Sequence, residues 1–292
     1  MRVLIIGTGF LGAKLMNKFS DEFEVFGTNL EGNNYFQLDI CNKKKKIYDL
    51  FNQINPDIVI HTAALSDVDQ CEEDRNLAEK ININGTKNVV EACKKKKIKL
   101  IFISTDFVFN GEKGDYSEID IPNPVNYYGK TKLNAEKLII DSGIEHIIVR
   151  TSVLYGYNNR DDRLNFFKWV YKNLENGTKI NVATDQINSP TLIDDIAKAL
   201  IILSKKEKGR NNERGIFNIA GSEAISRFDF AVKIAIFFGF NKKLIRPVKS
   251  NELGQKALRP HNSSLNISKI NNLGINMSNI NEGLKIIETF LK

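Results

Sequence analysis

Two residues with acid–base chemistry stand four positions apart in the segment NPVNYYGKTKLNAEK, namely Tyr128 and Lys132. On a helix, this spacing places both side chains on one face. A nearby ammonium favours the phenolate, so we expect Lys132 to lower the pKa of Tyr128 from its usual value of about 10. Such a phenol can give a proton to a carbonyl oxygen near neutral pH. Taken alone, the spacing is more often a half-buried aromatic beside a solvated lysine, so other segments must decide.

A glycine loop opens the chain in RVLIIGTGFLGAKLMNKF, where Gly7, Gly9 and Gly12 form GxGxxG between an apolar strand and a helix. Glycines permit the tight turn, the approach of backbone to a pyrophosphate and the packing of helix on strand, and the helix N-terminus favours the anion. The context predicts a nicotinamide dinucleotide here, with Phe10 and Leu11 also in contact with it. The alternative is a purely structural turn.

The second strand predicts little about cofactor preference. An acid at its end would bind the adenosine ribose and favour NAD, but VFGTNLEG has Thr28 and Asn29 there, and no arginine follows to bind a 2′-phosphate. We therefore expect NADPH or NADH, with a slight preference for NADP. Asn29 is a candidate cofactor contact. Asp39, with Ile40 in FQLDI, is a candidate for the adenine, although Asp39 fits equally well as a cap of the next helix.

Further candidates follow the later strands. In HTAALSDVDQ, the small Ala63 and Ala64 would let backbone lie against the cofactor, or would simply pack tightly; His61 is expected to be structural. Asn82 is an exposed-looking polar residue on a helix that could hold a water or a backbone carbonyl behind the site. Thr105 ends a strand and can donate to a carbonyl oxygen as negative charge develops, and Asp106 could bind a substrate hydroxyl.

Apolar strands alternate with amphipathic segments through the first half of the chain, which predicts an α/β fold with a doubly wound parallel sheet of the Rossmann type. The predicted strands are Val3–Ile6, Glu24–Gly27, Ile58–His61, Leu100–Ser104 and His146–Arg150, and the predicted helices include Arg75–Lys94 and Gly129–Ile140. We expect a dinucleotide-binding domain over 1–150. Residues 151–292 are expected to form mainly a smaller substrate-binding lobe, with some segments returning to the main sheet. Its predicted elements are the helices Leu164–Asn176, Ile193–Ser204 and Ser226–Phe238 and the strand Ile216–Ile219.

Composition excludes few classes. The 292 residues carry a net charge of +7, but the lysine runs 43–46 and 94–97 fit solvated helix faces better than a nucleic-acid site, and a basic surface also suits a nucleotide. Three cysteines and three histidines are scattered, so we expect neither a disulfide framework nor a metal site. With no leader pattern and no run of about 18 apolar residues, we expect a cytoplasmic protein without a membrane partner.

The residues resemble the extended short-chain dehydrogenase/reductases, and specifically the dTDP-4-dehydrorhamnose reductase family. The segments that carry the resemblance are GTGFLG, HTAALSDVD, ININGT, STDFVFNGEKGDYSE, IPNPVNYYGKTKLNAEK, RTSVLYG, DQINSPT, FNIAGSEAISRFDFA and RPHNSSLNISKI. The resemblance implies reduction of the 4-keto group of dTDP-4-dehydro-L-rhamnose to dTDP-L-rhamnose by an NAD(P)H-dependent oxidoreductase. It assigns catalysis to Thr105, Tyr128 and Lys132, with Asn82 in support, and substrate contacts to Asp106, Val153 and Arg259. A homodimer is a further open expectation.

Two departures from the family pattern keep alternatives open. The glycine loop is one residue shorter than the family's usual G-x-x-G-x-x-G, and Val153 stands where the family often has tryptophan. A reductase of a UDP-linked keto sugar would share every catalytic residue. The regulatory β subunit of methionine adenosyltransferase, which binds a dinucleotide without being an enzyme, is also similar in YGKTKL and ALRPHNSSL.

Overall fold

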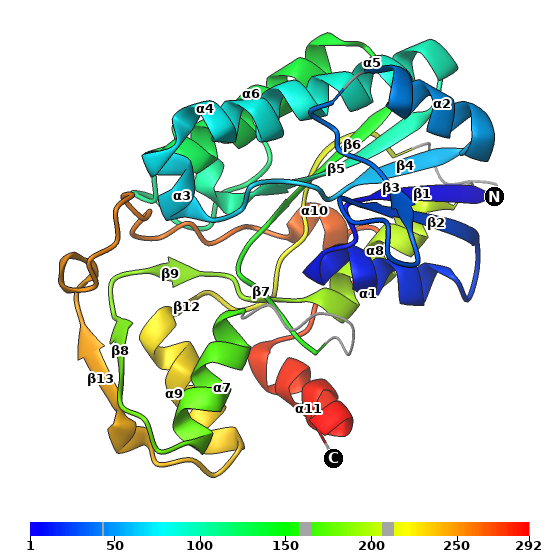
Figure 1. Ribbon diagram of the computed structural model, residues 1–292. Coiled ribbons are helices and arrows are strands. Elements are labelled where there is room, and N and C mark those ends of the chain that lie inside the picture. The colour runs from blue at the N-terminus through cyan, green and yellow to red at the C-terminus, as the bar shows by residue number, and fades with distance from the viewer. Residues whose placement is uncertain (43, 158–164, 206–212, 292) are drawn as a thin grey trace.

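The computed structural model describes residues 1–42, 44–157, 165–205 and 213–291. In these residues the main sheet has seven strands, all paired in parallel, with helices on both faces (Figure 1). Its order across the sheet is β11 (Gly215–Asn218), β6 (His146–Thr151), β5 (Lys99–Thr105), β4 (Ile58–His61), β1 (Arg2–Ile6), β2 (Glu24–Asn29) and β3 (Phe36–Gln37). The predicted fold class is confirmed, and each predicted strand lies within two residues of an observed one.

Side-chain alternation along β1 explains why the sheet is covered twice. Val3 and Ile5 point into one core with helices α1 (Phe10–Phe19) and α8 (Ile193–Ser204), while Leu4 and Ile6 point into the other. That second core is closed by α2 (Lys44–Ile54), α5 (Thr86–Lys96) and α6 (Tyr127–Asp141). Full burial of a side chain such as Ile5 stabilises the fold by about 1.5 to 3 kcal/mol. Because both faces are buried, the strands read as continuous apolar runs.

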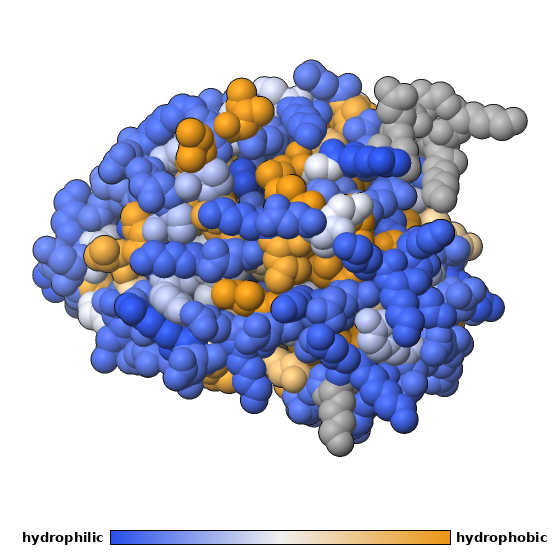
Figure 2. Space-filling model, turned by 90° about the horizontal axis from the view of Figure 1, so that it is seen from above, coloured by the Kyte–Doolittle hydropathy of each residue, from blue (hydrophilic) through white to orange (hydrophobic). Residues whose placement is uncertain are grey.

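The helical face seen from above is mostly hydrophilic, with separate apolar patches (Figure 2). Lysines 94–97 at the end of α5 are exposed, as are lysines 44–46 at the start of α2; Lys43 lies outside the described residues. Cations at the last turn of α5 interact favourably with the negative end of the helix dipole. Among the described helices, none combines the length and the apolar character needed to cross a bilayer.

A second lobe is built around a separate apolar core (Figure 1). Its described elements are α7 (Phe166–Glu175), α9 (Arg227–Phe237), α11 (Ile280–Leu291), the parallel pair β8 (Ile180–Ala183) and β13 (Ile245–Val248), and two short pairs. These pairs are β7 (Leu154–Tyr155) with β10 (Thr191–Leu192), and β9 (Ile187–Asn188) with β12 (Ile225–Ser226). The predicted start of a helix at Leu164 falls outside the described residues. Although α8 and β11 come from the second half of the chain, they pack on or within the main sheet.

Beyond β4 the chain forms α3 (Val68–Glu73), α4 (Arg75–Ala78), a π-helix (Glu79–Gly85) and then α5. The sequence predicted one helix over Arg75–Lys94, so the wider π turn in its middle is a difference. The π-helix packs against α6 and α5. Such insertions are rare and occur often at functional sites, and this one faces the helix that carries Tyr128.

Candidate active site

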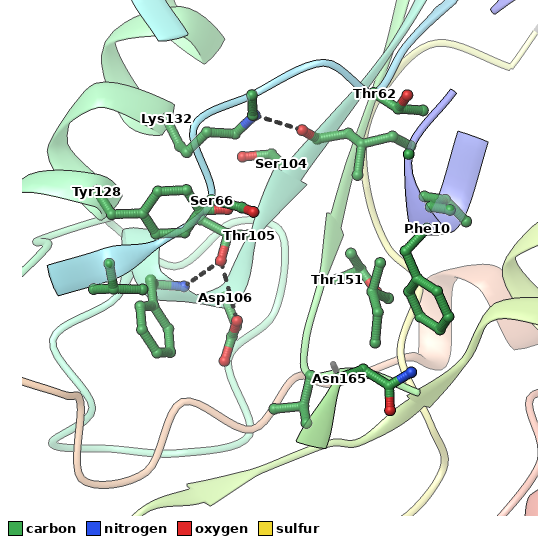
Figure 3. Close-up of a pocket in the computed structure, with 18 of the residues that line it drawn as sticks. Phe10, Thr62, Ser66, Ser104, Thr105, Asp106, Tyr128, Lys132, Thr151 and Asn165 are labelled. Atoms are coloured by element: carbon green, nitrogen blue, oxygen red, sulfur yellow. Dashed lines mark hydrogen bonds between the residues drawn. The ribbon is translucent and has the colours of Figure 1, made fainter. Parts of the chain in front are cut away.

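A cavity of about 410 Å³ opens where the carboxyl end of β5, the glycine loop and the second lobe meet (Figure 3). In parallel sheets, ligands bind at this edge, beside the strand at which the strand order reverses, here β1. The cavity is lined by nine of the residues singled out in the sequence: Gly9, Phe10, Leu11, Ala64, Thr105, Asp106, Tyr128, Lys132 and Val153.

The glycine loop is shaped by close contacts. Gly7 has φ +97°, and a β-carbon there would lie 2.7 Å from the backbone of Ala63; one on Gly12 would lie 2.0 Å from the carbonyl oxygen of Gly7. Gly7, Gly12 and Ala63 therefore pack strand, loop and helix together, whereas Gly9 faces the cavity. In the described structure α1 begins at Phe10 after the N-cap residue Gly9, without a side-chain cap and without an acid in its first turn. This arrangement fits the diphosphate of a dinucleotide.

Helix α6 brings Tyr128 to the end of β5. Asn126 caps the helix by accepting a hydrogen bond from the backbone N–H of Gly129 at 2.8 Å. Gly129 has no room for a β-carbon, which would lie 2.0 Å from the carbonyl oxygen of Phe107. Because helix and loop approach this closely, Tyr128 and Thr105 share one wall of the cavity (Figure 3). The Nζ of Lys132 donates to the carbonyl oxygen of Ile103 at 2.7 Å.

The predicted lowering of the Tyr128 pKa is wrong for this structure. Burial raises the pKa of Tyr128, the charge of Asp106 raises it further, and a hydrogen bond with Thr105 lowers it. Burial also lowers the pKa of Lys132 to about 7, with Glu136 acting in the opposite direction. A lysine that is only partly charged near neutral pH stabilises a phenolate weakly. The tyrosine therefore holds its proton until a reacting group draws it away.

Asp106 joins the two lobes. Its carboxylate accepts hydrogen bonds from Ser263 at 2.5 Å, Ser152 at 2.8 Å and Asn188 at 3.3 Å, and Thr105 donates to its other oxygen at 3.2 Å. Burial raises the Asp106 pKa, and these donors oppose that effect. A substrate hydroxyl that contacts Asp106, as expected, would thus meet a carboxylate that already accepts several hydrogen bonds from the protein. Ser152, Asn188 and Ser263 were not singled out in the sequence, although each lies in a segment that carried the resemblance.

Asn82 is buried rather than exposed, because the π-helix packs against α6. Its amide accepts from the backbone N–H of Leu65 at 2.8 Å and donates to the carbonyl oxygen of Leu65 at 3.0 Å. The same amide nitrogen lies 3.0 Å from the hydroxyl of Thr131 on α6. Of the two expected partners, a water or a backbone carbonyl, the described contacts include the carbonyl of Leu65, and Asn82 fixes the segment after β4 relative to the helix of Tyr128.

The arginine that lines the cavity is not the one we predicted. Arg259 pairs with Asp69 at 2.9 Å, donates to the carbonyl oxygen of Ala257 at 2.7 Å and is absent from the cavity wall. Arg227, at the start of α9, lines the cavity instead. Its segment, FNIAGSEAISRFDFA, was recognised, but nothing in its local pattern distinguished the arginine. Val153 lines the cavity with φ +40°, an unusual conformation for a β-branched residue.

The remaining cofactor candidates lie outside this cavity wall, and their roles stay predictions. Asn29 accepts from the backbone N–H of Gly32 at 2.5 Å, and Asp39 accepts from the N–H of Cys41 at 2.8 Å in the turn before α2. The side chain of Ile40 belongs to the core and would meet a β-carbon on Gly85. His61 is buried beside Thr86, and burial lowers its pKa to about 3, as befits a structural histidine. In the described part of the chain, no group of His, Cys, Asp or Glu side chains is arranged to hold a metal ion.

Comparison with known proteins identifies relatives along the whole chain. The family model described as RmlD substrate binding domain matches residues 1–290. A dTDP-4-dehydrorhamnose reductase from Aggregatibacter actinomycetemcomitans is 33% identical over 99% of both chains. The β subunit of methionine adenosyltransferase 2 from Rattus norvegicus is 28% identical over 94% of this chain and 83% of its own. The crystal structure of dTDP-4-dehydrorhamnose reductase from Bacillus anthracis in complex with NADP superimposes with a TM-score of 0.89 at 32% identity, covering 99% of this chain and 98% of the other.

Proposed function

Because the chain belongs to the family of the RmlD substrate binding domain, we propose that it reduces dTDP-4-dehydro-L-rhamnose to dTDP-L-rhamnose with NADPH or NADH. The observation that carries the proposal is the placement of Thr105, Tyr128 and Lys132 in one cavity beside the glycine loop. A binding module needs no such set of proton donors. In this proposal Tyr128 is the general acid.

The geometry supports a separate role for each of Tyr128, Thr105 and Lys132. When bound, the reduced nicotinamide supplies the hydride that reaches C4 of the sugar. Tyr128 donates its proton to the ketone oxygen, and its raised pKa keeps that proton in place beforehand. The hydroxyl of Thr105 orients the ketone and stabilises the charge that develops on its oxygen. Lys132, whose Nζ donates to the carbonyl oxygen of Ile103 on β5, would hold the nicotinamide ribose of the cofactor.

A regulatory role is the second candidate, because the methionine adenosyltransferase β subunits are also similar over most of the chain. The two functions place different requirements on the side chains of the cavity. An enzyme requires the hydroxyls of Thr105 and Tyr128 to face a substrate, whereas a regulatory subunit that binds a dinucleotide requires only the cofactor site and an outer surface that fits its partner. The intact set of hydroxyls favours the enzyme.

The test is a turnover assay. Purified protein, dTDP-4-dehydro-L-rhamnose and NADPH or NADH should give cofactor oxidation at about 1 to 10³ per second. NADPH and NADH should bind within about tenfold of each other, since β2 ends in Thr28 and Asn29 instead of an acid and no arginine follows closely. Oxidation with a UDP-linked keto sugar alone would keep the mechanism and change the substrate. No oxidation with any keto sugar, together with a stable complex with a methionine adenosyltransferase, would favour the regulatory function.

A further inference from the structure

Arg227 is the cation of the cavity wall that the proposed proton transfer does not use. It is the first residue of α9, after the cap Ser226, and its backbone N–H donates to the carbonyl oxygen of Gln186 at 2.9 Å. Its side chain enters the cavity that Thr105 and Tyr128 line from the opposite lobe. A long charged side chain usually extends to solvent, so its placement here calls for a partner.

Two contacts fix the plane of this guanidinium. Its Nε donates to the side-chain oxygen of Asn188 at 3.0 Å, and its central carbon lies 4.8 Å from the centre of the Phe166 ring. Within the described residues, neither Nη group has a hydrogen bond or ion pair to the protein. An arginine held through Nε and its flat face presents its two amino groups as a preorganised fork, which matches the oxygens of a phosphate.

Charges of both signs lie near Arg227, but the nearby carboxylate has other hydrogen-bond donors. Asp106 is the nearby carboxylate that acts on Arg227, but its oxygens are occupied by Thr105, Ser152, Ser263 and Asn188 rather than by the guanidinium. Arg259 is near enough to lower the pKa of Arg227 further, in addition to burial. The N-terminus of α7, capped by the cavity-lining Asn165, adds a positive helix end.

We propose that Arg227 binds the diphosphate of a nucleotide-sugar substrate. The proposal rests on the proposed function for the identity of that substrate. A chain of contacts, from Thr105 through Asp106 and Asn188 to Arg227, sets the spacing. Two hydrogen bonds and the amide group of Asn188 thus separate the guanidinium of Arg227 from the carboxylate of Asp106. In a 4-keto sugar nucleotide, the pyranose ring and one glycosidic oxygen separate the ketone from the first phosphorus. A ketone at Thr105 therefore allows the diphosphate to reach Arg227.

Binding of dTDP, dTMP and thymidine, measured by calorimetry, tests the assignment directly. Arg227→Gln should weaken dTDP binding about tenfold to a hundredfold, because a charge-assisted fork is lost, and should leave thymidine and NADPH binding unchanged. Arg227→Lys keeps the charge without the fork and should fall between Arg227→Gln and the unaltered protein. Arg246→Gln is the matched control, since Arg246 is exposed on β13 in the second lobe, and it should change nothing.

Three results with the variants would overturn the proposal. Equal losses of dTDP and thymidine binding in Arg227→Gln would indicate a structural wall, and a loss of NADPH binding would indicate the cofactor's diphosphate. The third is weaker dTDP binding in Arg259→Gln without any such effect in Arg227→Gln. Failure of the unaltered protein to bind dTDP would also reject it. Because no turnover enters the measurement, the two proposals fail separately. A protein that reduces no keto sugar but loses dTDP binding on Arg227→Gln would contradict the proposed function and support this one.

Discussion

The Nζ of Lys132 donates a hydrogen bond to the backbone carbonyl oxygen of Ile103, 2.7 Å away, and so ties α6 to β5 two residues before Thr105. The bond satisfies one of the three donors of the ammonium, and Nζ also lies 4.0 Å from the centre of the Phe102 ring. Burial nevertheless lowers the Lys132 pKa to about 7. A negatively charged partner would therefore increase the fraction of Lys132 that is charged near neutral pH. We propose that this partner is the anionic cofactor.

We expect NADH binding to weaken as the pH rises above 7. The Lys132 pKa is about 7 in the free protein, and an anionic ligand raises it. When binding raises the pKa of a group, the group contributes its full share of the binding free energy at a pH below its pKa in the free protein. This contribution is lost as the pH rises through the pKa that the group has in the complex. The affinity should fall by up to about tenfold per pH unit within that window. Calorimetry should show proton uptake on binding, and NADH avoids titration of a 2′-phosphate.

Lys132→Met should remove this pH dependence. Lys130→Met is the control, because Lys130 lies two positions earlier on α6 with an exposed side chain and should keep the dependence. A pH dependence that survives in Lys132→Met would contradict the assignment of the proton to Lys132.

Removing the hydroxyl of Tyr128 should stop proton transfer and leave the cofactor site intact. Tyr128→Phe should lower kcat by about 10² to 10⁴ with little change in NADPH affinity, since general acid catalysis contributes about that much. The neighbouring Tyr127 is a matched control, because its hydroxyl bonds Glu79 near the surface instead of facing the cavity. Tyr127→Phe should keep nearly full turnover. Equal turnover of the two variants would show that Tyr128 is not the acid.

Local spacing predicted the parts of the site that are local. The positions of Tyr128 and Lys132 on one helix follow from the four-residue interval, and the packing of Gly7 and Gly12 follows from the strand, loop and helix pattern. The alternating apolar runs likewise predicted the parallel sheet, because strands covered on both faces have few polar positions.

The features of the site that the sequence did not predict depend on packing between segments far apart in the chain. Asp106 meets Asn188 and Ser263 across 82 and 157 positions of sequence, and no local period predicts such a meeting. The pKa of Tyr128 moved upward because burial outweighed any effect of the lysine, and the depth of burial depends on both lobes. Arg227 and Arg259 are equally basic in sequence. Only the ion pair with Asp69 shows that Arg259 is engaged elsewhere.

Asn82 should matter for both stability and turnover. Asn82→Ala leaves the backbone N–H and carbonyl of Leu65 without their side-chain partner, which should lower the free energy of unfolding by about 1 to 3 kcal/mol. Because Asn82 also contacts Thr131, three residues after Tyr128, kcat should fall more than KM rises. Denaturant titration and steady-state kinetics measure the two effects. Asn76→Ala, at an exposed position of α4, should change neither; an equally stable and active Asn82→Ala would refute the role.

At the position of Val153, a glycine variant should be more stable than an alanine variant, which is the reverse of the usual order. Its φ of +40° is unfavourable for a residue with a β-carbon, and the conformation is held by a bond from the N–H of Thr191 to its carbonyl oxygen at 3.1 Å. At ordinary positions of a helix or strand, glycine is less stable than alanine by about 0.5 to 1 kcal/mol. Here Val153→Gly should be more stable than Val153→Ala by about 1 kcal/mol in denaturant titrations, because only glycine adopts this φ without steric conflict. Both variants remove the same contacts made by the valine methyl groups, so their difference isolates the backbone. If Val153→Ala proves the more stable, the backbone at this edge of the cavity is not strained.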